Sequence, residues 1–242
     1  MRLLLRVISF AIGKLLFFLP GPTRGMVAFE IVSRLGRLLQ RPPPGGPDAP
    51  RYLNLGCGDQ ILAGFLNLDF FTTPKIDYGA DLRSPLALES NAFDGVFSEH
   101  TVEHLTYAES AALLRECHRI LKPGGLLRIV VPDLALFIRH YSAGDQQWFA
   151  AWERLMFSGS TDPVRARRVL STPLEAISFV TQEYGHLSAW DFETLAVYAG
   201  RCGFSEITRQ AFRQGALPAL LVDLDAEDRK FVSLYLEARK GA

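Results

Sequence analysis

The sequence has no excess of charge of either sign, no paired cysteines and no long uninterrupted apolar run. Lys plus Arg and Asp plus Glu both total 26 in 242 residues, so the formal net charge is zero. A neutral chain lacks the basic face that binding to long nucleic acid requires. The three cysteines, Cys57, Cys117 and Cys202, are odd in number and far apart. They predict no disulfide framework, no cysteine-based zinc site and a reducing, cytoplasmic setting.

The first twenty residues are apolar, but Arg6 and Lys14 interrupt them. The apolar run is therefore too short for a transmembrane helix, and Leu19–Pro22 does not resemble a signal-peptide cleavage site. On a helical wheel, Arg2 and Arg6 share a narrow polar strip beside a broad apolar face. Two interpretations stay open. The helix packs on its own domain or on a second copy in a homodimer, or it is an amphipathic anchor lying peripherally on the inner face of a membrane.

A proline-rich linker, Arg41–Pro47, divides the chain, because its prolines cannot continue a helix and its glycines break a strand. We expect an N-terminal helical appendage with linker over residues 1–45 and a catalytic domain over residues 46–242. In the domain, short apolar runs alternate with helical spacing, as in repeated strand–helix–strand units. The expected strands are 52–55, 65–69, 95–98, 126–131, 206–212 and 231–238. The pattern predicts an α/β, doubly wound, Rossmann-like domain.

A glycine turn follows the first predicted strand. Leu55 leads directly into Gly56-Cys57-Gly58, where the chain must reverse and let a ligand approach the backbone. Gly-x-Gly alone is weak evidence, because many nucleotide-binding folds use it. The third glycine of the dinucleotide pattern is replaced by Ile61. This replacement argues against a pyrophosphate site.

Two carboxylates follow the next predicted strands. Asp69 ends the second strand, where it can accept hydrogen bonds from both hydroxyls of a ribose. Asp81 comes next, and it can accept from an adenine amino group while the backbone of Leu82 reads the ring edge. Either acid alone is equally consistent with a helix cap. Three successive strand ends carrying a glycine turn, Asp and Asp in this order favour an adenosyl site.

Five segments carry a family resemblance. LNLGCG, the acid of LNLDF, ADLRSPL, FDGVFSEHTVEHL and LKPGGLLRIVVPDL resemble, in that order, the motifs of class I S-adenosylmethionine-dependent methyltransferases. The likeness is strongest to the small bacterial type 11-like group with a shortened first crossover. It implies a seven-stranded sheet with an antiparallel last strand, and S-adenosylmethionine as the cofactor. It places the methionine moiety against Gly56–Gly58, the ribose on Asp69 and the adenine near Asp81 and Leu82.

The resemblance also places Ser98, Glu99 and His100 at the end of the fourth strand, facing the cofactor. Only ten residues separate Gly58 from Asp69, so the first connection must be short or irregular. His100, Glu103 and His104 match the zinc pattern His-x-x-Glu-His. Because the resemblance assigns this segment to a strand end and a helix start, we predict no metal there.

The candidate catalytic residues are Glu99, His100, Asp133 and His186. A carboxylate at Glu99 suits a positive sulfonium, and a histidine suits deprotonation of an oxygen nucleophile near neutral pH. Asp133, just after the fifth strand, is a candidate for orienting the acceptor or acting as base. Each histidine is equally consistent with a structural role.

Residues 134–181 form the expected substrate-side insertion, a helical cap. Its aromatic residues are mostly expected to be the core of the cap, and Arg165, Arg167 and Arg168 either meet an anionic acceptor or form a solvated face. We expect methyl transfer to a small-molecule, glycan-type or lipid-linked acceptor, at oxygen. The competing hypotheses are a Rossmann-type nucleotide-dependent oxidoreductase and a non-catalytic, cofactor-binding partner protein.

Overall fold

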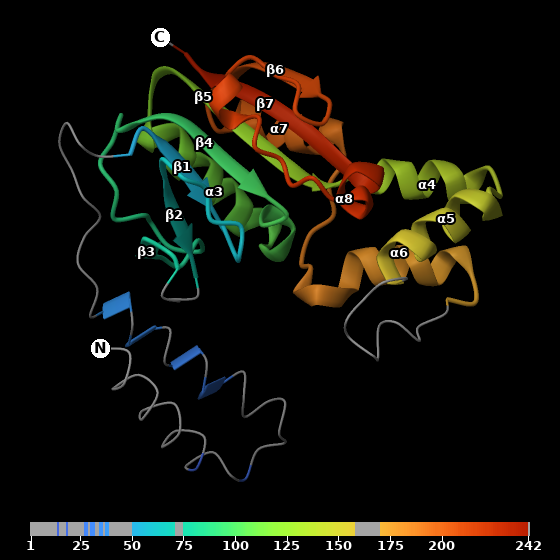
Figure 1. Cartoon of the computed structure of the whole chain (residues 1–242). Helices are drawn as coiled ribbons and strands as arrows, with labels where there is room; N and C mark the ends of the chain where they lie inside the picture. The colour runs from blue at the N-terminus through green and yellow to red at the C-terminus, as the bar shows by residue number, and fades with distance from the viewer. Residues whose placement is uncertain are drawn as a thin grey trace.

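One mixed sheet organises the catalytic domain. The computed structural model describes residues 50–70, 75–157 and 170–241, and positions 14, 18, 27, 28, 30, 31, 34, 35, 37 and 38. Its seven-stranded sheet has the order β3-β2-β1-β4-β5-β7-β6 (Figure 1). Strands β1 to β5 pair in parallel, whereas β7 runs antiparallel to both β5 and β6. The predicted doubly wound α/β fold with an antiparallel last strand is confirmed.

The observed strand bounds agree best with the predicted ones where turn residues flank a short apolar run. The strands are β1 (Tyr52–Leu55), β2 (Phe65–Asp69), β3 (Tyr78–Gly79), β4 (Phe93–Glu99), β5 (Leu121–Pro132), β6 (Phe204–Gln210) and β7 (Ser233–Lys240). Strands β1 and β2 have their predicted bounds. The prediction that β5 begins at Leu126 was wrong. Leu121 already pairs with Phe93, and the segment 122–125 bulges before the register resumes at Leu126.

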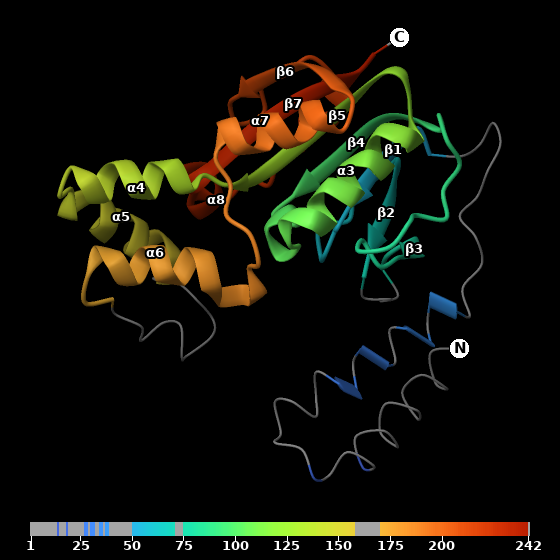
Figure 2. The same ribbon diagram turned by 180° about the vertical axis from the view of Figure 1, so that it is seen from behind.

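Helices α3 (Tyr107–Ile120) and α7 (Phe192–Arg201) cover one face of the sheet (Figure 2). Thr106 begins α3 through a capping box with Glu109. Asp191 caps α7 by accepting from the Thr194 backbone N–H at 2.8 Å. Gly203, with φ +98°, follows the end of α7. Their apolar faces join the inner sheet residues in the largest core cluster.

An extended segment, 211–226, which includes the short 3-10 helix η4 (Pro218–Leu220), lies over the opposite face. It is tied to the sheet by Arg128, whose side chain is fully buried in β5. The guanidinium donates to both carboxylate oxygens of Asp223 at 2.7 and 2.6 Å, and to Glu237 at 3.0 Å. The network therefore holds the segment against the sheet by charge-assisted hydrogen bonds.

The β1–β2 connection is short and contains no helix, as the sequence predicted. Buried asparagines hold it instead. Asn54 donates to the Gln60 carbonyl at 2.7 Å and to the Asn67 side chain at 3.0 Å. The Asn67 amide donates to the Leu62 carbonyl at 3.0 Å. These bonds satisfy the backbone carbonyls of Gln60 and Leu62, which a crossover helix would otherwise satisfy internally.

A helical cap continues from the carboxyl end of β5 (Figure 1). It contains α4 (Leu134–Ser142), α5 (Gln146–Phe157), α6 (Pro173–Gln182), the 3-10 helix η3 (Glu183–Gly185) and, from the C-terminal part of the chain, α8 (Glu227–Val232). Its core is formed by Phe137, Phe149, Trp152, Phe157, Ala176, Phe179 and Val232. The expectation that most aromatics of the insertion are core residues is confirmed. Helix α8 was not predicted, and it moves the start of β7 from residue 231 to Ser233.

Part of the N-terminal appendage contacts the domain. Arg37 donates to the Phe70 carbonyl at 2.8 Å and lies 4.1 Å from the centroid of the Phe70 ring. Glu30 lies 3.5 Å from the Arg83 guanidinium. The predictions for the apolar leader, for the linker 41–47 and for Arg165, Arg167 and Arg168 fall on residues outside those described. Among the described residues, no helix is long and apolar enough to span a membrane.

Candidate active site

The glycine turn after β1 is held against β2 by the backbone. The N–H groups of Gly56 and Cys57 both donate to the Leu68 carbonyl, at 2.8 and 3.0 Å. Gly56 and Gly58 have φ +71° and +51°, values that favour glycine. Leu55 and Cys57 are buried, and burial raises the pKa of the Cys57 thiol to about 12. Cys57 is therefore a packed, protonated thiol.

Asp69 lies beside this turn, as predicted. Its Oδ2 accepts from the Gly58 backbone N–H at 2.8 Å, and the residue is only 9% exposed. The acid at the end of β2 and the turn at the end of β1 therefore form one unit. Among the described residues, no atom lies within 4 Å of the position that a Cβ would take on Gly58, so space adjoins the backbone there.

Asp81 has an ionic partner that the sequence analysis did not anticipate. Arg83 donates from Nε and Nη2 to the two carboxylate oxygens, at 2.8 and 2.7 Å. The hydrogen bond from Arg83 lowers the pKa of Asp81. Leu82 is buried next to it. Any adenine amino group near Asp81 shares its carboxylate with Arg83.

The two polar side chains at the end of β4, Ser98 and Glu99, have different surroundings. Ser98 is 1% exposed, and its Oγ has no hydrogen-bond partner among the described residues. Glu99 accepts from the Leu224 backbone N–H at 3.0 Å through Oε2. Burial raises the pKa of Glu99. Glu99 is thus turned toward the segment 211–226 rather than toward the glycine turn.

His100 connects β4 to the next structural layer. Its φ of +48° is unusual for a residue with a side chain. One ring nitrogen, Nε2, lies 2.9 Å from Ser233 Oγ, and the other, Nδ1, lies 3.2 Å from Glu103 Oε1. With both nitrogens engaged, His100 holds Glu103 in place.

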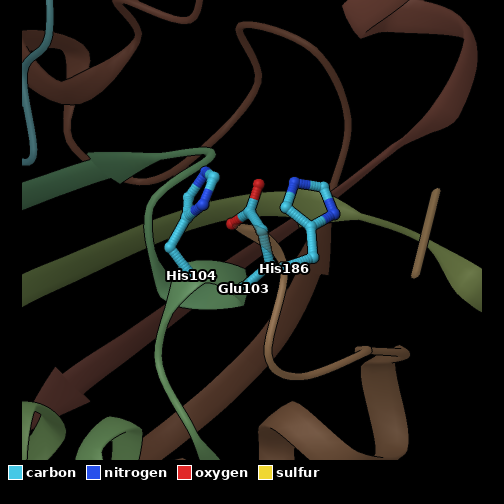
Figure 3. A group of neighbouring side chains, drawn as sticks. All are labelled: Glu103, His104 and His186. Atoms are coloured by element: carbon cyan, nitrogen blue, oxygen red, sulfur yellow. The ribbon is translucent and has the colours of Figure 1, made fainter. Parts of the chain in front are cut away.

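Glu103, His104 and His186 converge (Figure 3). Each offers one ligand-type atom, and these atoms all lie within 4.8 Å of one another. Glu103 and His104 come from the 3-10 helix η1 (Val102–His104), and His186 directly follows η3. Backbone bonds bring the two segments together, because Leu187 and Ser188 donate to the Glu103 carbonyl at 2.8 and 3.2 Å.

The ionisation of this cluster follows from its burial. Burial alone would raise the pKa of Glu103, but the His100 ring, whose Nδ1 lies 3.2 Å from Oε1, holds the pKa below its ordinary value. Burial lowers the pKa of His104. The cluster therefore favours a charged carboxylate beside a neutral imidazole.

The cluster lies at one wall of a cavity of about 370 Å³. The sheet side contributes the ends of β4 and β5, and the cap contributes α5 and α6. The lining residues are His100, Glu103, His104, Pro132, Trp152, Met156, Phe179, Val180, His186, Asp228, Arg229 and Val232. The sequence pattern predicts no metal at Glu103 and His104, and it contains no signal for Arg229.

Asp133 is not brought into this group. Its Oδ1 accepts from the Ala135 backbone N–H at 3.2 Å as the cap of α4, and its Oδ2 lies 3.3 Å from Arg209. Burial raises its pKa. Of the four candidate catalytic residues, only His100 and His186 line the cavity.

Comparison with known proteins gives one family. Residues 73–129 match the family model described as a methyltransferase domain. No curated protein matches the sequence.

Solved structures with similar chain traces share little sequence. A possible exported protein from Bordetella parapertussis has a TM-score of 0.46 and 16% identity, over 87% of this chain and 66% of that one. A methyltransferase from Thermotoga maritima, described as S-adenosylmethionine-dependent, has a TM-score of 0.47 and 15% identity, over 88% and 90%. Phosphoethanolamine N-methyltransferase 2 from Haemonchus contortus has a TM-score of 0.45 and 14% identity, over 86% and 52%.

The family match begins just before β3 and ends within β5. It includes the acid after β3, the end of β4 and helix α3, and the glycine turn and Asp69 lie on the two strands beside it. Residues 73–129 thus match a methyltransferase domain, and they lie on strands of a seven-stranded sheet with a reversal of strand order between β1 and β4.

Proposed function

We propose that the carboxyl ends of β1, β2 and β4 bind S-adenosylmethionine. The backbone of Gly56–Gly58 takes the methionine moiety, Asp69 takes the ribose, and Asp81 with Leu82 takes the adenine. The support is the 2.8 Å bond from Gly58 to Asp69, which fixes the acid at the turn, and the space beside Gly58. The buried, unpartnered Ser98 Oγ adds a polar atom at the end of β4. These residues fit the cofactor.

The adenine end is bordered by the N-terminal appendage. Arg83 lies between Asp81 and Glu30, and Arg37 covers Phe70 just after β2. The appendage therefore contributes charged groups next to the acids proposed for the adenosine.

The acceptor is a small-molecule or glycan-type compound that is methylated at oxygen. The observation that carries this proposal is the cavity of about 370 Å³ lined by three histidines, Glu103 and Arg229. Its size is typical of small-molecule sites, and its lining combines the aromatic side chains of Trp152 and Phe179 with several polar groups that can orient a ligand. Arg229 gives the cavity a cation that can orient an anionic or hydroxyl-rich acceptor.

The bound cofactor supplies an electrophilic methyl group on a sulfonium, so the protein mainly aligns the acceptor and accepts its proton. The proton acceptor is the cluster of Glu103, His104 and His186. His186 donates from Nδ1 to the Val180 carbonyl at 2.7 Å, which makes Nε2 the basic nitrogen. His100 is a positioning residue that acts through Glu103. Asp133 has no part in proton transfer, because Ala135 and Arg209 engage its two carboxylate oxygens. Glu99 has none because it lies outside the lining of this cavity and accepts from Leu224 instead.

Two measurements test this function. Calorimetry with S-adenosylmethionine and S-adenosylhomocysteine should give one site per chain. Release of S-adenosylhomocysteine should then be followed with matched hydroxyl and amine acceptors of sugar size. We expect turnover with hydroxyl acceptors, and His186→Ala should reduce it while leaving S-adenosylhomocysteine affinity unchanged. Turnover with amines alone would contradict transfer to oxygen, and a failure to bind either cofactor form would contradict the site.

A further inference from the structure

The cluster of Glu103, His104 and His186 has the composition of a metal site. Two imidazoles and one carboxylate are a common ligand set for Zn²⁺ and other first-row divalent cations. Their ligand-type atoms lie within 4.8 Å of one another. Figure 3 shows the Glu103 carboxylate between the two rings, with one nitrogen of His186 directed toward it. The three side chains thus surround one small volume at the cavity wall.

The burial of Glu103 is the second, independent observation. The residue is 2% exposed, and neither of its carboxylate oxygens has a hydrogen-bond partner among the described residues. A buried carboxylate oxygen without a partner is costly, because it loses its hydration and gains nothing in return. Oε1 has a neighbour in His100 Nδ1 at 3.2 Å. A cation between the two rings would satisfy the remaining charge and the remaining lone pairs.

The surrounding hydrogen bonds are those that a metal site requires. Ligating histidines usually donate their second ring N–H to a carbonyl or carboxylate, which fixes the tautomer and the ring orientation. His186 does so toward the Val180 carbonyl at 2.7 Å. His100 performs the equivalent task for Glu103, and its own Nε2 lies 2.9 Å from Ser233 Oγ. The outer contacts of His186 and Glu103 are therefore in place.

We propose that Glu103, His104 and His186 bind one divalent cation of the Zn²⁺ type, with a coordination position open to the cavity. Zinc bonds of about 2.1 Å place tetrahedral ligands about 3.4 Å apart, so side-chain rotations on the order of 1 Å complete the site. The segment joining η3 to α7 supplies His186, which replaces His100 in the linear His-x-x-Glu-His pattern. His100 is the outer residue instead.

The role of the ion rests on the proposed function. An acceptor hydroxyl that coordinates a divalent cation loses its proton near neutral pH, and the proton leaves to water. The alkoxide oxygen then forms a bond to the methyl carbon as the carbon–sulfur bond breaks. The products are a methyl ether and S-adenosylhomocysteine. In this arrangement His186 binds the cation and does not itself accept the proton. The cluster then promotes deprotonation by lowering the pKa of the acceptor hydroxyl that the cation binds.

The test uses the full-length protein after removal of metals with a chelator. Titration with Co²⁺ alone, followed by its visible absorption and by calorimetry, should show one site per chain with a low-symmetry, N/O-ligated spectrum. Zn²⁺ should displace the Co²⁺ signal. His186→Ala and Glu103→Gln should weaken Co²⁺ binding by at least about 100-fold, and His100→Ala by about 10- to 100-fold. His140→Ala removes a histidine that pairs with Asp145 at 2.9 Å outside the cavity lining, so it should leave binding unchanged.

Binding of S-adenosylhomocysteine, measured on the same samples, separates the two proposals. A protein that binds the nucleoside but no Co²⁺ overturns the metal site and leaves the methyltransferase proposal standing. Equal Co²⁺ affinity in His186→Ala and in the unmodified protein overturns the ligand assignment. Because Glu103 is buried, unchanged melting temperature and nucleoside binding in Glu103→Gln are required before its metal affinity is compared. If Glu103→Gln does not fold, the Co²⁺ affinity of His186→Ala decides whether the ligand assignment holds.

Discussion

Gly56 is the position at which the fold tolerates no side chain. A Cβ there would lie 2.3 Å from both Cγ2 and Oγ1 of Thr101, which no real pair of atoms reaches. The backbone also has φ +71°, which costs a residue with a side chain about 1–2 kcal/mol. Gly56→Ala therefore carries a conformational cost and a steric cost together. Gly58→Ala is its matched control, because φ is +51° there and no atom of the described part of the chain lies within 4 Å of its added Cβ.

The steric cost is set by what Thr101 would have to give up. Its hydroxyl lies 3.1 Å from the Glu99 carbonyl and 3.2 Å from the Gly56 carbonyl. Displacing it forfeits about 0.5–1.5 kcal/mol of hydrogen bonding. Forcing an extra carbon into a packed site costs about 1–3 kcal/mol more. We expect Gly56→Ala to lower the free energy of unfolding by about 2–4 kcal/mol more than Gly58→Ala does.

Urea denaturation followed by circular dichroism and tryptophan fluorescence measures both free energies of unfolding, provided that the two probes give coincident transitions. Thr101→Ala, combined with Gly56→Ala, removes the two closest atoms and should restore part of the loss, so the two substitutions should not be additive. Equal destabilisation by the two alanine variants would refute the steric reasoning. A double variant no more stable than Gly56→Ala would refute the assignment to Thr101.

Three further predictions address charge. Asp69→Ala should weaken S-adenosylhomocysteine binding by about 1–3 kcal/mol in calorimetry, whereas Asp59→Ala, whose side chain is 97% exposed, should not. Arg128→Met leaves two buried carboxylates without their cation, and should cost about 3–5 kcal/mol in urea denaturation; a loss near zero would contradict the network. Because burial raises the pKa of Glu99 above its ordinary 4.5, the folded state holds that proton more tightly. The stability from this group is present below pH 4.5 and is lost as the pH rises through the folded pKa. Glu99→Gln should therefore raise the melting temperature at pH 8, with the gain vanishing below pH 4.5.

The parts of the site that the sequence predicted are those built from neighbouring strand ends. The glycine turn and Asp69 meet because β1 and β2 pair in parallel, so their carboxyl ends share one edge of the sheet. A strand assignment alone was enough to place them together. Asp81 was placed correctly after β3, but its bidentate pair with Arg83 depends on side-chain rotamers two residues apart, which strand patterns do not determine.

The histidine cluster could not be predicted in the same way. Its linear pattern included His100, yet the left-handed backbone at His100 turns that ring toward Ser233 and the outer side of Glu103. His186 arrives from beyond the cap, through backbone bonds of Leu187 and Ser188 to the Glu103 carbonyl. Such bonds carry no sequence signal. Likewise, Asp133 is a strand-end acid by position, and only the structure shows that it caps α4 and pairs with Arg209.

Glu103 has two separable tasks, and this separation bears on how the cavity works. Its backbone carbonyl accepts the two N–H groups that anchor the segment after His186, so it joins the sheet to the cap. Its side chain faces the cavity and the two rings. Glu103→Gln keeps the first task and changes only the second, because the carbonyl is untouched and the side-chain volume is nearly conserved. If Glu103→Gln loses acceptor methylation while cofactor affinity and cap packing stay intact, the reaction depends on the charge of the carboxylate. It does not then depend on the backbone bonds of Leu187 and Ser188 to the Glu103 carbonyl.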